Sequence, residues 1–200
     1  MTDDFYAFLK EPTKENFLKA HSYIAQHEDY NPYSNDLNQM EDLLEKNEFQ
    51  KALDYANINV MLSPRAHLMK KYAATQLENE EAANAEYFLA MRILEGIEST
   101  GDGSKEHPYL VLRVNDEGDL LSYLEEEYQV QQLIQEDIIY DAITTKSGKT
   151  IYFDITNCYQ KMNTFSMDDF LNNLGISEED FDENVVTPSE KKKKWWQFWT

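Results

Sequence analysis

Cysteine is nearly absent from this chain of 200 residues, in which Cys158 stands alone. One cysteine cannot form an internal disulfide, so other interactions must hold the fold together. Histidine is also scarce: His21, His27, His67 and His107 include no pair three or four residues apart, which is the spacing of zinc ligands on a helix. We therefore expect neither a metal site nor another cofactor.

Long apolar runs are missing as well. No stretch approaches the ~18 apolar residues that a membrane-spanning helix needs. The acidic start MTDDFYAFLK also lacks the basic and apolar regions of a secretory leader. These two absences predict a cytoplasmic protein, or one that lies at the inner face of the membrane.

Basic residues are few, and several of them cluster in one place. The chain has 18 Lys and Arg against 38 Asp and Glu, a formal charge of −20. Without Lys191, Lys192, Lys193 and Lys194 the charge of the remainder is −24. Such a surface repels phosphates, so we expect no nucleic-acid partner, whereas a basic protein would be complementary. The alternative is an acidic surface that only maintains solubility.

Apolar residues are plentiful enough to form a core, at 42% of the chain. We predict an α+β fold with tetratricopeptide-like helical hairpins on a small antiparallel sheet, then a short C-terminal helix and a flexible tail. Residues 1–98 should form the helical region, 99–182 a small α+β region that shares its core, and 183–200 the linker and tail.

The helical region shows clear start and stop signals. A helix should begin after Thr13, and the segment YNPY should interrupt the helices because Pro32 disfavours a helical conformation at Asn31. The segment NEFQKALDYANINVMLSP, residues 47–64, resembles the second helix of a tetratricopeptide repeat in the spacing of its alanines and proline. An echo of its start follows 33 residues later, near the ~34-residue period. We expect two helical hairpins, over residues 37–62 and 65–97.

Shorter elements are expected after residue 98. We predict a strand over residues 109–114, a helix over 119–128, an antiparallel hairpin formed by DIIYDAITT and KTIYFDIT, and a helix over 166–175. The preceding loop, STGDGSKEHP, contains Gly101, Asp102 and Gly103 and is a candidate anion-binding loop, because amides at glycines can bind an anion. A plain turn between helix and strand is the alternative, since the phosphate-loop pattern is absent.

Several of these segments together resemble a known type of family. SYIAQHEDYNPY, STGDGSKEHPYLVLRV, IIYDAI and KTIYFDIT, in this order, are similar to an uncharacterised bacterial family of domains of unknown function. The resemblance covers about residues 22–156. It implies an α+β architecture and no established activity, so it provides no catalytic residues.

The most distinctive segment is the last, KKKKWWQFWT, which we call the Lys/Trp tail (residues 191–200). Lysines attract anionic lipid and tryptophans favour the membrane interface, but tryptophans also serve as anchors in protein interfaces. The tail could therefore bind a membrane surface, a partner protein or the chain's own body. Its candidate docking residues are Lys191, Lys192, Lys193, Lys194, Trp195, Trp196, Phe198 and Trp199.

No nucleophile, paired acid and base, or metal-ligand pattern indicates an enzyme. We expect a non-catalytic acidic module that binds a basic protein, for example an immunity protein that inhibits a bacterial toxin. A membrane-associated factor and an unrecognised enzyme are the alternatives. The candidate acidic face consists of Glu41, Glu45, Glu48, Glu78, Glu80 and Glu81.

Overall fold

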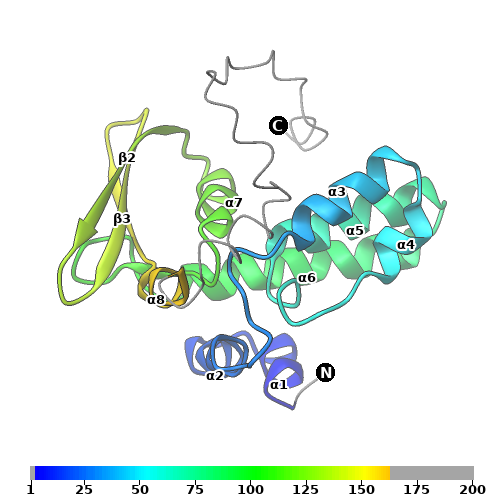
Figure 1. Cartoon of the computed structure of the whole chain (residues 1–200), viewed down its shortest axis with the longest axis horizontal. Coiled ribbons are helices and arrows are strands. Elements are labelled where there is room, and N and C mark those ends of the chain that lie inside the picture. The colour runs from blue at the N-terminus through cyan, green and yellow to red at the C-terminus, as the bar shows by residue number, and fades with distance from the viewer. Residues whose placement is uncertain (1–2, 163–200) are drawn as a thin grey trace, which may run out of the picture.

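The computed structural model describes residues 3–162, which form eight helices and a four-stranded sheet (Figure 1). The elements, in chain order, are α1 (Asp3–Lys10), α2 (Lys14–Ala25), α3 (Asp36–Glu45), α4 (Phe49–Asp54), α5 (Pro64–Gln76), α6 (Glu80–Glu98), β1 (Tyr109–Leu110), α7 (Asn115–Tyr123), β2 (Tyr128–Gln135), β3 (Ile139–Thr145), β4 (Thr150–Asp154) and α8 (Thr156–Met162). The predicted α+β fold class is confirmed.

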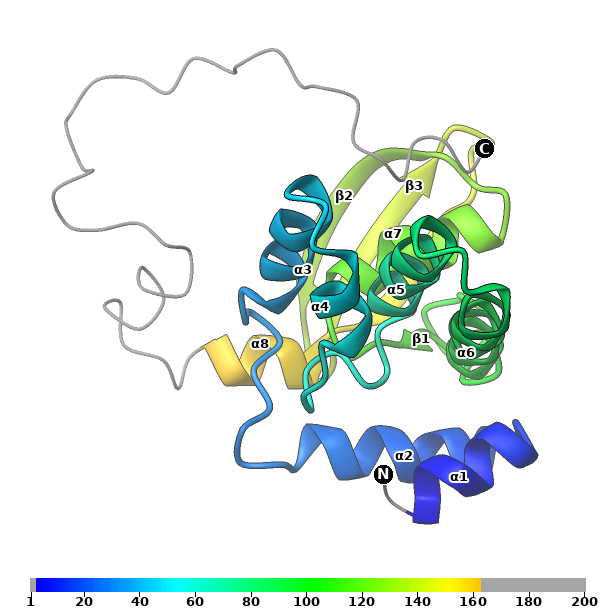
Figure 2. The same cartoon turned by 90° about the vertical axis from the view of Figure 1, so that its right-hand side faces the viewer.

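Side-chain caps define where three of the helices begin. The hydroxyl of Thr13 accepts the N–H of Asn16 at the start of α2, as the sequence predicts. Ser63 caps α5, where Pro64 occupies the first turn without losing a hydrogen bond, and Asn79 caps α6. Helices α3 to α6 form one helical region, and the pair α1 and α2 lies beneath it (Figure 2).

The first helical hairpin is shorter than the sequence predicts. Helix α4 ends at Asp54, so the second half of residues 47–64 is not helical. The reason lies in polar contacts with the start of α3, where Asp36 accepts hydrogen bonds from Tyr55 Oη and Asn57 Nδ2, both at 2.6 Å. These contacts hold the chain after α4 in an irregular conformation. The second hairpin, α5 and α6, agrees with the prediction.

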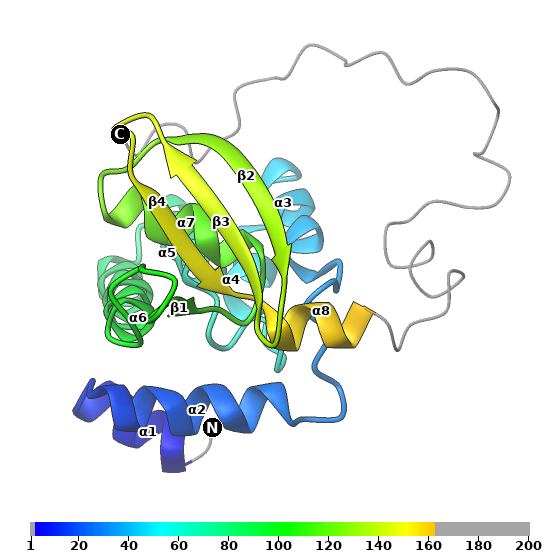
Figure 3. The same cartoon turned by 90° about the vertical axis from the view of Figure 1, so that its left-hand side faces the viewer.

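The sheet has the strand order β1-β4-β3-β2 (Figure 3). The predicted hairpin of β3 and β4 is present. Strand β1 is shorter than the strand predicted over residues 109–114, and it pairs with β4 in parallel over two residues, whereas the prediction was an antiparallel sheet. Strand β2 was not predicted, and α7 lies earlier than the helix predicted over residues 119–128. The predicted helix over residues 166–175 lies outside the described residues. A short helix, α8, follows β4 directly.

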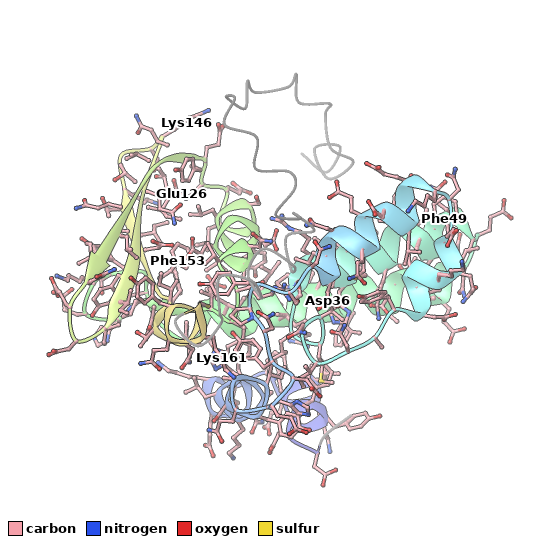
Figure 4. All side chains as sticks on the ribbon, in the orientation of Figure 1. Asp36, Phe49, Glu126, Lys146, Phe153 and Lys161 are labelled. Carbon is pink, nitrogen blue, oxygen red and sulfur yellow. The ribbon has the colours of Figure 1, made fainter. Side chains whose placement is uncertain are left out.

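A hydrophobic core joins the sheet to α1, α2, α6, α7 and α8. Phe153 of β4 is fully buried and faces α7 (Figure 4). Helix α6 approaches α1 and α2 closely at Gly96, where an added Cβ would lie 2.3 Å from a ring carbon of Phe17 and 2.9 Å from one of Phe8. A second cluster, around Met40 and Met69, fills the space between α3, α4 and α5.

Candidate interaction surface

The two helical hairpins turn at the same end of the helical region, far from the sheet (Figure 1). Both turns use a residue in the left-handed conformation, Asn47 with φ 58° and Glu78 with φ 56°. The N–H of the residue that follows each one reaches back to a carbonyl five residues earlier, at Leu43 and Ala74. This geometry reverses the chain sharply and leaves the flanking side chains in solvent.

Four of the predicted acidic residues are exposed at this end: Glu45, Glu78, Glu80 and Glu81. Glu80 and Glu81 occupy the first turn of α6, where a negative charge is favourable to the helix dipole. We call these four residues the acidic end. Phe49 lies near it (Figure 4), and Leu77 is 39% exposed beside Glu78. The acidic end thus combines negative charge with accessible apolar surface.

The other two predicted acidic residues differ from this group. Glu48 is half-buried and forms an ion pair of 2.6 Å with Lys51. Glu41 is also half-buried, and its charge acts on Arg65, the partner of Asp119 in an ion pair of 2.7 Å. The structure therefore places four of the six residues together at one exposed end.

The loop around Gly101, Asp102 and Gly103 is closed upon itself. The N–H groups of Asp102 and Gly103 both donate to the carbonyl of His107, at 3.0 and 3.1 Å, and Asp102 Oδ1 accepts the N–H of Ser104. Gly103 has φ 76°, and its carbonyl accepts the N–H of Tyr152 of β4. Because these two amides are already bonded within the protein, this geometry favours a structural turn over an anion-binding loop.

The sequence reasoning missed a group of buried carboxyl groups around α7. Asp116 and Glu117 are 1% and 3% exposed, and Asp141 of β3 is 4% exposed. Burial raises the pKa of Asp116 to about 7, and burial beside Asp141 raises the pKa of Glu117 to about 9. Neither carboxyl lines the cavity of about 590 Å³ that Ile58 and Met61 border. Both acids lie in the polar run NDEGD, residues 115–119, so no pattern in the sequence predicts their burial.

A buried arginine connects this group to the helical region. The guanidinium of Arg113 donates to the carbonyls of Asn59 and Ser34, at 2.8 and 3.0 Å, and also to Ser34 Oγ. The backbone N–H of Arg113 donates to Asp116. One side chain therefore joins two irregular segments to the start of α7.

A cavity of about 590 Å³ lies between α2, α5 and the segment after α4. Ile58, Met61 and Tyr23 contribute apolar surface, and His27 and Lys70 contribute polar groups. No pattern in the sequence predicts this cavity, because its walls come from segments that are far apart in the chain. Buried His67 borders it and is held by Glu86 at 2.6 Å and by the carbonyl of Met61.

Other predicted features concern metal ions, membranes and the tail. Within residues 3–162, no group of three or more His, Cys, Asp or Glu side chains is arranged to hold a metal ion. No helix in the described part of the chain is long and apolar enough to cross a membrane. All eight docking residues of the Lys/Trp tail lie outside the described residues.

The comparisons with known proteins give one match. No curated protein and no solved structure matches the chain. A family model does match, over residues 14–164, which include α2 to α8 and end before the Lys/Trp tail. The prediction of an uncharacterised domain family is thus confirmed. The chain belongs to the family described as Domain of unknown function (DUF4919).

Proposed function

We propose that this protein is a non-catalytic module that binds a basic protein partner through the acidic end. The observation that supports this most is the arrangement of two separate turns, which bring Glu45 and the acids at 78, 80 and 81 to one exposed end (Figure 1). Residues 3–162 carry 30 acidic and 14 basic side chains, a formal charge of −16. A field of this sign steers a basic partner towards the surface.

Charge alone gives little affinity. An exposed ion pair contributes about 0.2–1 kcal/mol, whereas apolar anchors dominate most interfaces. Leu77, which is 39% exposed, supplies such an anchor beside the acidic end, and Phe49 nearby is half-buried. A specific form of the proposal is an immunity protein in the cytoplasm, which would cover the basic active site of a bacterial toxin.

The experiment uses each basic protein encoded beside this gene as the probe. The probe is mixed with the chain, and the affinity is measured in low and in high salt. We expect a complex that dissociates as salt is added, because salt screens exposed charges. Replacing the acids at 78, 80 and 81 by glutamine should weaken the complex between a few-fold and about a hundred-fold, from the loss of three exposed ion pairs.

The matched control removes three exposed charges from the region of α1 and α2, with Asp3 replaced by asparagine and Glu11 and Glu28 replaced by glutamine. This control loses charge away from the acidic end and should keep most of the affinity. The proposal is wrong if no neighbouring basic protein binds. It is also wrong if both variants bind as tightly as the unmodified chain.

The composition of the Lys/Trp tail supports a second candidate function, binding to an anionic membrane surface. Each lysine near an anionic leaflet contributes about 1 kcal/mol, and indoles favour the interface. Flotation with vesicles that contain phosphatidylserine tests this function. The full chain should float with these vesicles and not with neutral ones, and a chain with Lys191 to Lys194 replaced by glutamate should not float.

A further inference from the structure

Strand β2 forms one edge of the sheet, and it lacks the usual protection of edge strands. Natural edges are short or carry charges or proline, which prevent the addition of another strand. The eight residues of β2, YQVQQLIQ, include neither a charged residue nor a proline. Tyr128, Val130 and Leu133 are 53%, 55% and 45% exposed. This edge is therefore suited to accept a further strand.

The hydrogen-bonding pattern shows which groups the edge offers. Ile139 accepts the N–H of Ile155, and Thr145 donates to Lys149, so the odd-numbered residues of β3 bond towards β4. Bonding alternates along an antiparallel strand, so the even-numbered residues of β3 bond towards β2. From the register, these pair with the residues of β2 at 130, 132 and 134. The N–H and C=O groups of Gln131, Leu133 and Gln135 therefore point to the open edge.

Carboxylates lie at both ends of this edge. Glu125, Glu126 and Glu127 precede β2, and Glu136 and Asp137 follow it. Glu126 and Lys146 mark the end of the sheet where β2 begins (Figure 4). Three of the five acids have a lysine partner, Lys149, Lys146 and Lys105. Glu125 and Asp137 are exposed and have no ion pair among the described residues.

We propose that the Lys/Trp tail adds to β2 as a fifth strand of the sheet. Its last six residues, WWQFWT, are uncharged and rich in residues that favour strands. Its four lysines can then lie beside the carboxylates at one end of β2. An edge of eight residues is about 27 Å long, and the ten residues of the tail can cover it.

The chain is long enough for this contact. Residues 163–190 separate α8 from the tail and can span up to about 95 Å when extended. Helix α8, which these residues follow, lies near the C-terminal end of β2, because Tyr159 of α8 accepts a hydrogen bond of 2.6 Å from Gln135. The tail can therefore reach either end of the edge.

Charge favours the tail over a second copy of the chain as the occupant. If two β2 strands paired antiparallel through these outward groups, with Gln131 of one copy opposite Leu133 of the other, Glu127 of one copy would lie opposite Asp137 of the other, next to further acids. Like charges in opposite positions destabilise a strand pair. The lysines of the tail would instead lie beside these acids, where opposite charges attract. The tail occupies the edge of β2 when the chain is alone, and a partner or a membrane would compete with this edge for the tail.

Tryptophan fluorescence of the full chain tests the inference, because all three tryptophans, Trp195, Trp196 and Trp199, belong to the tail. We expect emission at a shorter wavelength, and quenching by acrylamide several-fold weaker, than in the free peptide KKKKWWQFWT. Leu133→Pro removes one outward N–H without breaking the bonds to β3, so it should restore peptide-like emission. Leu133→Thr keeps that N–H and serves as the matched control.

Two further measurements do not depend on the folding of an edge variant. Replacing the four tail lysines by glutamate should also release the tryptophans. In the unmodified chain, the amide hydrogen of Leu133 should exchange slowly, and exchange should speed up in this tail variant. Peptide-like emission in the unmodified chain would overturn the inference. So would shielded emission that Leu133→Pro leaves unchanged, or shielding lost on dilution, which would indicate the edge of a second copy.

Discussion

Glu117 of α7 and Asp141 of β3 form a hydrogen bond between two carboxyl groups in the interior of the protein. Gln131 of β2 donates to Oδ2 of Asp141. The raised pKa of Glu117, about 9, means that it keeps its proton at neutral pH and is the donor to Asp141. One shared proton therefore helps to attach α7 to the sheet.

This arrangement predicts how stability depends on pH. In the unfolded chain Glu117 ionises near its usual pKa of 4.5, whereas the folded protein holds the proton up to about pH 9. The folded state thus binds more protons between these values. Its stabilising contribution is complete below about pH 4.5 and is lost as the pH rises towards 9, at up to about 1.4 kcal/mol per pH unit.

The variant Glu117→Gln tests this prediction, because an amide of similar shape can donate to Asp141 but cannot ionise. Urea unfolding at several pH values should show that the variant loses less stability than the unmodified protein between pH 7 and 9. The control Glu125→Gln, at an exposed site, should retain the original profile. If Glu117→Gln and the unmodified protein have parallel profiles, Glu117 does not hold a proton in the folded state.

The sequence predicts the elements whose own residues determine them. Thr13 marks the start of α2, and the β-branched and aromatic residues on both sides of the turn at Lys146, Ser147 and Gly148 predict the hairpin of β3 and β4. Strand β2 was missed because its glutamines hide the alternation, and its pairing with β3 is a tertiary interaction. The length of α4 depends on Asp36, which binds Tyr55 across the hairpin. Contacts of this kind, between residues that are far apart in the chain, leave no periodic pattern in the sequence.

The same distinction applies to the candidate surface. A count of charges predicts an acidic protein, and the turns that gather Glu45 with Glu78 follow from two predicted hairpins. Whether an acid is exposed or buried cannot be read from its type. Glu117 and Glu125 are eight residues apart and chemically identical, yet only Glu117 is covered by the sheet. Only the structure therefore shows which of the acids are buried.

Two glycines should respond to substitution in opposite directions. Gly96→Ala would place a methyl group against the rings of Phe17 and Phe8, and overpacking of this kind costs about 1–3 kcal/mol. Gly118→Ala, within α7, meets only Arg65 at 3.9 Å and should stabilise the helix by up to about 1 kcal/mol. Urea unfolding of both variants measures the two effects. An equal effect of both substitutions would contradict the close packing at Gly96.

Cys158 should be unreactive in the folded protein. Burial raises the pKa of its thiol, and Sγ donates to the carbonyl of Leu112 at 3.0 Å. The thiolate is the reactive form, so both effects slow alkylation. We expect iodoacetamide to modify the native chain far more slowly than the urea-unfolded chain. Equal rates in the two states would show that α8 does not cover this residue.

Arg113 should be the side chain whose loss most weakens the connection between the helical region and α7. Arg113→Ala leaves the carbonyls of Ser34 and Asn59 without their donor and removes the positive charge beside Asp116. Breaking a buried group of this kind costs about 3–5 kcal/mol. Arg113→Lys should recover only part of the loss, because one ammonium group cannot reproduce the fork that spans both segments.

Thermal unfolding of the two Arg113 variants, followed by circular dichroism, measures this difference. Hydrogen exchange at residues 57–61 adds a local measurement. These residues include Asn59, whose carbonyl Arg113 binds, and they line the cavity of about 590 Å³. In Arg113→Ala they should exchange faster than in Arg113→Lys, since Asn59 is no longer held. If lysine restores both stability and protection in full, the charge matters and the two-segment bridge does not. If alanine is tolerated without loss, the bridge has no structural role.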